Sequence, residues 1–160
     1  MGDWGDFHVA MVGATAALAG LVIVAASVNI GEIVKAPALT ARLGTAIAGL
    51  VLALVVSAVG LAPGVPAALY GSIAAVIAVM AATFALSAAR RIFAEHDARN
   101  RLRGVKAGIG FVAPAAYVVG GILMLVGDVD AGSAAFALGA LLSVVVALTI
   151  SWIVLVEVLR

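Results

Sequence analysis

The chain has 160 residues, of which 66% are hydrophobic and 11% are charged, and its formal net charge is +1. Soluble globular domains are closer to half apolar and a quarter charged, and nucleic-acid-binding domains are usually strongly basic, so neither class fits. The absence of cysteine excludes disulfides, thiol chemistry and iron–sulfur ligation. The length fits one compact domain.

Long uncharged stretches account for most of the hydrophobic residues. About 20 apolar residues are needed to cross about 30 Å of hydrocarbon as a helix, and barrel strands would be shorter and would alternate with polar residues. The first stretch is too long, and the residues before it too acidic, for a cleaved signal peptide. We therefore expect an all-α polytopic membrane bundle with five transmembrane helices, at about residues 7–34, 41–62, 66–92, 106–127 and 132–157.

Prolines set some of the expected boundaries. The first helix is expected to stop before Pro37, and the third to begin at Pro66, where a helix has no need of the missing N–H. Pro114 lies inside the fourth span, close before Tyr117. We expect the Tyr117 hydroxyl to donate to the carbonyl that Pro114 leaves free, nominally that of Gly110, or to a hydroxyl on another span.

Basic residues are concentrated between residues 90 and 106, which hold six of the nine lysines and arginines. Loops that carry lysine and arginine stay in the cytoplasm. With this loop inside, the N-terminus lies outside and the C-terminus lies inside. All nine basic residues are then cytoplasmic, and the outer side keeps only Asp3, Asp6, Asp128 and Asp130.

The same loop has a candidate binding role. Arg99, Arg101, Arg103 and Lys106 form a cluster that is suited to anionic lipid head groups. The alternatives are that the cluster only determines topology, or that it contacts a soluble partner.

Aromatic residues lie near the expected span ends. Trp4, Phe7 and Tyr70 fall at the outer interface, and Phe93 and Trp152 fall toward the inner one. Such rings usually anchor a protein at the two membrane surfaces, and we expect that role here.

Small residues recur on one face of the first span, at steps that alternate between three and four. They are Ala10, Gly13, Ala17, Gly20, Ser27 and Gly31, and Val24 fills the one position of this series that is not a small residue. Small side chains let helices approach closely in lipid, so we expect this seam to pack against another helix, in the protomer or across a subunit boundary. Small residues also recur every four positions between Ala41 and Ser57 and between Ala131 and Ser151. These two ladders are either interfaces or a consequence of the composition.

A sparse polar line lies roughly opposite the seam. His8, Thr15 and Asn29 share it, and Glu32 follows at the cytoplasmic end of the span. One hypothesis is that these residues line a narrow pore in an oligomer, with Asn29 and Glu32 at its mouth. The alternative is structural, with Thr15 bonding its own backbone and Glu32 pairing with a nearby cation.

No catalytic constellation is visible. The two histidines, His8 and His96, lie on opposite sides of the membrane in the expected topology. Residues 43–89 contain no ionisable side chain apart from Tyr70, whereas ion-coupled transporters usually carry charges at mid-depth. We expect neither an enzyme nor a bound cofactor or metal.

The segment FHVAMVGATAALAGLVIVAASVNIGEIV, from Phe7 to Val34, resembles the opening span of a group of small bacterial multi-span integral membrane proteins. The resemblance implies a multi-pass protein of the bacterial cytoplasmic membrane, and it implies no particular activity.

These observations favour a protein that works as an oligomer, since five short-looped helices enclose little volume. The first hypothesis is a channel-like or transport protein. The alternative is a non-catalytic accessory or scaffold subunit of a larger membrane complex. The expected partners are the lipid bilayer and a second copy or another membrane protein, and no nucleic acid is expected.

Overall fold

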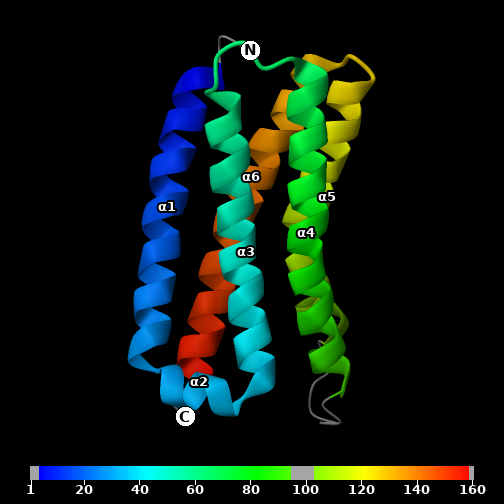
Figure 1. Ribbon diagram of the computed structural model, residues 1–160. Coiled ribbons are helices and arrows are strands. Elements are labelled where there is room, and N and C mark those ends of the chain that lie inside the picture. The colour runs from blue at the N-terminus through cyan, green and yellow to red at the C-terminus, as the bar shows by residue number, and fades with distance from the viewer. Residues whose placement is uncertain (1–3, 95–102, 159–160) are drawn as a thin grey trace.

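The computed structural model describes residues 4–94 and 103–158. The described chain is all-helical and contains six helices (Figure 1). They are α1 (Gly5–Val28), α2 (Ile30–Lys35), α3 (Pro37–Gly60), α4 (Ala67–Ala94), α5 (Arg103–Leu125) and α6 (Val129–Val158). All except α2 are long and apolar enough to cross a membrane, which confirms the helical class and the five apolar segments expected from the sequence.

The first expected span is divided into two helices by Asn29. Its backbone, at φ −112° and ψ 19°, leaves the helical conformation, and its carbonyl accepts hydrogen bonds from the amides of Glu32 and Ile33. The side-chain amide of Asn29 donates to the carbonyl of Ala25 over 3.3 Å. Asn29 therefore closes α1 and starts α2, which crosses the end of the bundle from α1 to α3 (Figure 1).

The helix before Pro37 ends at Lys35, as expected, but Pro37 also begins the next helix, which the sequence did not predict. The proline occupies the first turn of α3, a position whose N–H would have no partner in a helix. Ala36 is extended, as expected for a residue before proline, and it alone separates α2 from α3. The second span therefore starts four residues before the expected residue 41.

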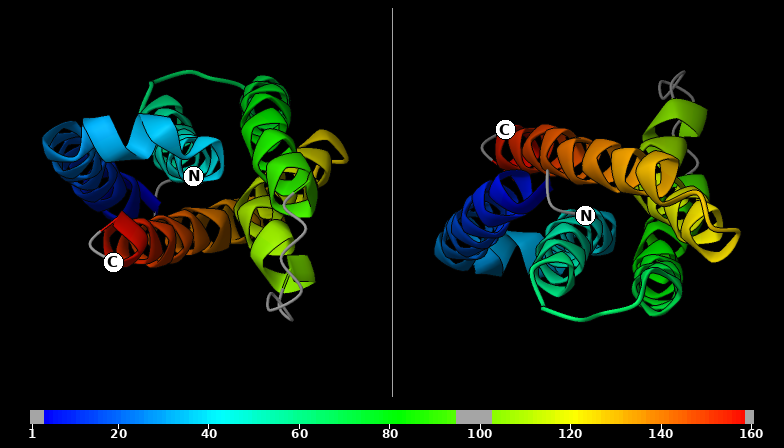
Figure 2. Two further views of the ribbon diagram at one scale, coloured as in Figure 1. Left: turned by 90° about the horizontal axis from the view of Figure 1, so that it is seen from below. Right: turned by 90° about the horizontal axis from the view of Figure 1, so that it is seen from above.

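Helix α3 lies between α1 and α4, and α6 crosses the opposite side of the bundle (Figure 2). α3 contacts α1, α4 and α6, while α5 packs against α4 and α6. α6 runs obliquely, from α5 at one end of the bundle toward α1 at the other (Figures 1 and 2). The start of α1 and the end of α6 lie at opposite ends of the bundle (Figure 1).

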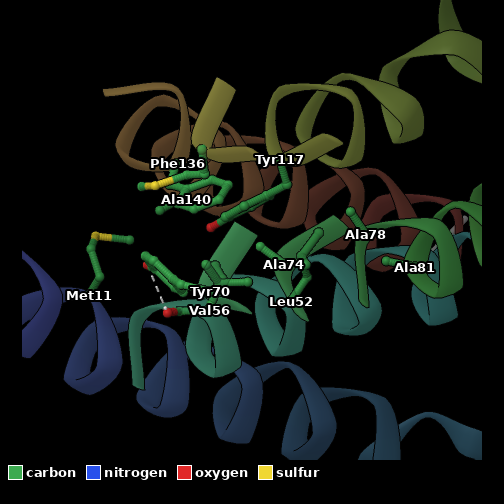
Figure 3. Packing of buried hydrophobic residues seen from close by; sticks show 12 residues of the cluster. Met11, Leu52, Val56, Tyr70, Ala74, Ala78, Ala81, Tyr117, Phe136 and Ala140 are labelled. Atoms are coloured by element: carbon green, nitrogen blue, oxygen red, sulfur yellow. Dashed lines mark hydrogen bonds between the residues drawn. The ribbon is translucent and has the colours of Figure 1, made fainter. Parts of the chain in front are cut away.

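Two hydrophobic clusters form the core. The first joins all five long helices in the half of the bundle near the N-terminus, and its large members include Tyr70, Tyr117 and Phe136 (Figure 3). The second lies toward the other end and is built from buried residues of α1, α2, α3 and α6, such as Ile33, Leu50 and Val154. At that end the α4–α5 pair contributes no buried residue to the second cluster.

The small-residue ladders of α3 and α6 face the interior. Every member from Ala41 to Ser57 and from Ala131 to Ser151 is buried or half-buried. Thr45 and Ser143 donate to carbonyls of their own helices, those of Ala41 over 3.0 Å and Gly139 over 2.9 Å, whereas the buried hydroxyl of Ser151 has no hydrogen-bond partner in the described residues. Both ladders are therefore real packing surfaces of the protomer.

A further small-residue stripe on α4 was not singled out in the sequence. Its members are all buried and follow steps of three and four: Gly71, Ala74, Ala78, Ala81, Ala85 and Ala88. It faces the α4–α5 contact, the most extensive one in the bundle. A Cβ added to Gly121 of α5 would lie 2.7 Å from the carbonyl oxygen of Gly71, so the two backbones touch there.

Short turns join the helices at the N-terminal end. Gly64 (φ 74°) and Gly127 (φ 93°) adopt left-handed backbone conformations that favour glycine. Asp128 caps α6, since its carboxylate accepts a hydrogen bond from the amide of Ala131 over 3.1 Å.

Candidate functional site

Helix α1 presents two contrasting faces, and they make it the candidate site. Its inner face carries the predicted polar line: His8, Thr15 and Val22 are buried, and Asn29 is half-buried. The hydroxyl of Thr15 donates to the carbonyl of Met11 over 2.6 Å, so it is satisfied within its own helix. The polar line therefore lies inside the protomer rather than on its outer surface.

His8 lies where α1 meets the end of α3 and the start of α4. A Cβ added to Gly60 would lie 2.9 Å from Nε2 of His8 and 2.8 Å from the hydroxyl oxygen of Tyr70. Glycine at position 60 therefore lets both rings approach the backbone of α3. Nδ1 of His8 is buried and has no hydrogen-bond partner in the described part of the chain.

Aromatic rings continue from His8 into the core. Neighbouring ring centroids lie between 5.0 Å and 6.4 Å apart, and most pairs meet edge to face, the arrangement that ring quadrupoles prefer. In order, the rings are Trp4, Phe7, His8, Tyr70, Phe136 and Tyr117. The part from Tyr70 to Tyr117 is visible in Figure 3.

Tyr70 lies in the core rather than at the membrane surface. It is only 2% exposed, and its hydroxyl donates to the carbonyl of Val56 on α3 over 3.1 Å, as the dashed line in Figure 3 marks. The expectation of an interfacial anchor is therefore wrong for this ring. Its position next to a helix end gave the wrong signal, because Gly60 opens space for it inside the bundle.

Tyr117 is fully buried, and its hydroxyl has no hydrogen-bond partner in the described residues. The expected bond to the Gly110 carbonyl is absent from that part of the chain. α5 continues through Pro114, and Ser143 uses its own hydroxyl on the carbonyl of Gly139. The ring instead fills the space left by Gly139, where an added Cβ would lie 2.9 Å from it.

The outer face of α1 carries the predicted seam except for its last member, Gly31, which lies on α2. Ala10, Gly13, Ala17, Gly20, Ser27 and Gly31, together with Val24, are all exposed. No atom of a neighbouring element lies within 4 Å of a Cβ added to Gly13, Gly20 or Gly31. The seam therefore packs against no other helix of the described chain. Ser27 donates to the carbonyl of Ile23 over 2.7 Å, so this face exposes no unsatisfied hydroxyl.

The seam differs from the α4 stripe in its surroundings and not in its spacing. Both follow steps of three and four along one helix face. The α4 stripe is covered by α5, and an added Cβ at Gly71 would collide with it. The protein thus uses one such surface internally and leaves the other bare.

Charged residues lie at the two ends of the bundle. Lys35, Arg42, Arg90 and Arg91 lie at the end that carries α2, together with Glu32 and Glu157, and we call this the basic end. Asp6, Asp128 and Asp130 lie at the opposite, acidic end. Among the described residues, no group of three or more His, Cys, Asp or Glu side chains is placed to hold a metal ion.

Glu32 is paired at the basic end. Its carboxylate lies 2.7 Å from Nζ of Lys35, and both side chains are exposed. Such exposed pairs contribute about 0–1 kcal/mol to stability. A second pair joins α3 to α6, with Nη1 of Arg42 3.0 Å from a carboxylate oxygen of Glu157.

The predicted lipid cluster falls only partly within the described residues. Arg103 and Lys106 belong to the first turn of α5. Arg99 and Arg101 lie outside the described ranges, as does His96.

Comparison with protein-family models, curated proteins and solved structures finds no match to this chain. The resemblance of the first span to small bacterial membrane proteins therefore stays a prediction.

Proposed function

We propose that this chain is a non-catalytic, multi-pass membrane protein that assembles with further copies of itself through the outer seam of α1. The observation that carries the proposal is the bare seam. In lipid, helices gain little by hiding apolar surface, and they associate where small residues allow close contact. Gly13 and Gly20 on α1, and Gly31 beyond the break on α2, offer that contact, and no neighbouring element of the described chain lies within 4 Å of a Cβ added to them.

The internal use of an equivalent surface supports this proposal. The stripe on α4 has the same spacing and meets α5 so closely that Gly71 and Gly121 touch. A second α1 would meet the outer seam in a comparable way. A two-fold pair in which the same face serves both copies is the simplest closed arrangement.

Orientation and location form part of the same proposal. We infer a bacterial cytoplasmic membrane, with the basic end in the cytoplasm and the acidic end outside. Lys35, Arg42, Arg90 and Arg91 at one end and the aspartates at the other support this orientation.

An oligomeric channel, the first hypothesis from the sequence, has less support. A pore between subunits needs polar groups on the outer surface, but His8 and Thr15 face their own bundle. Glu32 is exposed, but it is already paired with Lys35. Ion flux in liposomes that Glu32→Gln alters would favour the channel over the assembly role.

The test of the seam is the oligomeric state in nanodiscs, measured by mass photometry. Gly20→Leu places a bulky side chain on the seam, and leucine favours a helix more than glycine does by about 1 kcal/mol, so the variant should fold. We expect the wild type to be oligomeric and Gly20→Leu to be monomeric.

Ala14→Leu is the matched control, because Ala14 is exposed on another face of α1. It should remain oligomeric. A monomeric wild type, or equal dissociation in both variants, would contradict the proposal.

A further inference from the structure

A cavity of about 230 Å³ lies inside the basic end of the bundle. Its walls come from α3, α4, α5 and α6. It lies beside the second hydrophobic cluster, to which α4 and α5 contribute no buried residue and against which Ile109 of α5 packs. The exposed residues Val105 and Thr149 belong to its wall, so it reaches the surface of the bundle between α5 and α6.

The wall of this cavity is almost entirely apolar. Its two hydroxyls are used within their own helices: Thr45 donates to the carbonyl of Ala41 over 3.0 Å, and Thr149 donates to that of Val145 over 2.8 Å. An apolar cavity of about 150 Å³ in a protein can bind benzene, so this one has room for a larger hydrocarbon. The remaining wall includes Ala85, Ala88, Ile92, Ile109, Ile150 and Ile153.

Arg42 is the one charged residue among the described residues of the wall. Its side chain is 11% exposed, and Nη1 lies 3.0 Å and 3.3 Å from the two carboxylate oxygens of Glu157. A guanidinium has five N–H donors, and within the described residues Nε and Nη2 make no hydrogen bond. The cavity therefore combines an apolar chamber with a cation that keeps donors for another anion.

We propose that this cavity holds part of one acyl chain of an anionic phospholipid, with the lipid phosphate bound to Arg42. The charge at this end favours an anionic lipid, because Lys35, Arg90 and Arg91 surround the same membrane surface. Basic side chains near a membrane surface attract anionic lipids. The site is remote from the outer seam of α1, so it does not depend on the assembly proposed above.

The experiment uses the full chain in phosphatidylcholine nanodiscs that contain a little phosphatidylglycerol with a diazirine in its acyl chain. After illumination, mass spectrometry locates the labelled residues. We expect labelling of the wall around Ala88, Ile109 and Ile150 above that of the lipid-facing Val119, which is 52% exposed. Wall labelling no higher than at Val119 would overturn the proposal.

A substitution that blocks the entrance tests whether the lipid chain enters the cavity. Thr149→Phe places a ring at the mouth without crowding the core, because Thr149 is exposed, and it should abolish wall labelling. Leu148→Phe is the matched control, since Leu148 is 50% exposed and lies outside the wall. Retained labelling in Thr149→Phe, or equal loss in both variants, would overturn the proposal.

The phosphate contact has its own test. Diazirine-labelled phosphatidylcholine should label the wall less than phosphatidylglycerol does, and Arg42→Gln should reduce this preference about tenfold, the value of a charged hydrogen bond in affinity. Glu157→Gln, which removes the competing carboxylate, should keep the preference. Equal labelling by the two lipids in the wild type, or loss in Glu157→Gln as well, would overturn the role of Arg42.

Discussion

At Gly71 there is no room for a methyl group. A Cβ there would lie 2.7 Å from the Cβ of Met124 and 2.9 Å from the carbonyl oxygen of Gly121, and a backbone cannot move aside as a flexible side chain can. Gly71→Ala must force α4 and α5 apart. We expect it to lower the free energy of unfolding by about 1–3 kcal/mol, as overpacking usually does. Steric-trap unfolding in bicelles measures this change.

Gly108→Ala is the control for that variant. Gly108 is exposed on α5, and nothing lies within 4 Å of an added Cβ. Because alanine favours a helix by about 1 kcal/mol over glycine, this variant should be as stable as the wild type or more so. Equal losses in both variants would show that the close approach of α4 and α5 is not what limits stability.

Replacing tyrosine by phenylalanine should have different effects at the two buried positions, Tyr70 and Tyr117. Tyr70→Phe removes the hydrogen bond to the Val56 carbonyl and should cost about 0.5–1 kcal/mol of unfolding free energy. Tyr117→Phe removes a buried hydroxyl that has no partner among the described residues, and it should leave stability unchanged or increased. The same unfolding assay compares them. A loss in Tyr117→Phe as large as that in Tyr70→Phe would contradict the expected difference.

At the scale of single helices, hydropathy and spacing predicted much of the structure. The five apolar segments and the two four-residue ladders follow from chain length and from which positions share a helix face. The same rules do not say which face meets a neighbour. The glycine-rich seam on α1 was predicted from the sequence, but it meets no other helix of the described chain. The largely alanine stripe on α4, from Gly71 to Ala88, was not predicted, although it faces the most extensive helix contact in the bundle.

The helix boundaries that sequence reasoning missed have local causes. Asn29 breaks the first span through its backbone conformation, which the residue types in this span do not predict. Pro37 marks the end of one helix and also the start of another, and sequence reasoning predicted only the end. The sequence correctly placed the polar residues on one face of the first helix. It could not show that this face points inward, because that depends on where α3 packs, and the residue pattern of α1 does not specify the position of α3.

The ion pair between α3 and α6 gives a prediction for the contact between these elements. Arg42 and Glu157 are 115 residues apart in the chain and join the two helices at the basic end. Because Glu157 is 38% exposed, we expect a modest coupling of about 1 kcal/mol. A double-mutant cycle with Arg42→Gln and Glu157→Gln measures it as the difference from additivity of the unfolding free energies. Strict additivity would mean that the pair does not hold α3 to α6.

For the whole molecule, the separation of charge between the two ends predicts its orientation. The described aspartates Asp6, Asp128 and Asp130 lie at one end, and the described lysines and arginines lie at the other. Because retained positive charge fixes which loops stay in the cytoplasm, the basic end should face inward and the turn between α3 and α4 should face outward. The chain has no cysteine, so a single introduced thiol reports one position without background.

Ala62 follows α3 and Ala94 ends α4, so Ala62→Cys and Ala94→Cys place such thiols at opposite ends of the bundle. Both residues are exposed. In intact bacterial cells, a membrane-impermeant maleimide should label Ala62→Cys and not Ala94→Cys. After the cells are opened, both should react, which shows that Ala94→Cys is accessible in itself. The reverse pattern in intact cells would invert the orientation, and it would also move the Arg42 cavity to the outer leaflet. Labelling of both positions before opening would mean that the protein inserts in two orientations, because the charge at the basic end is then too weak to fix one.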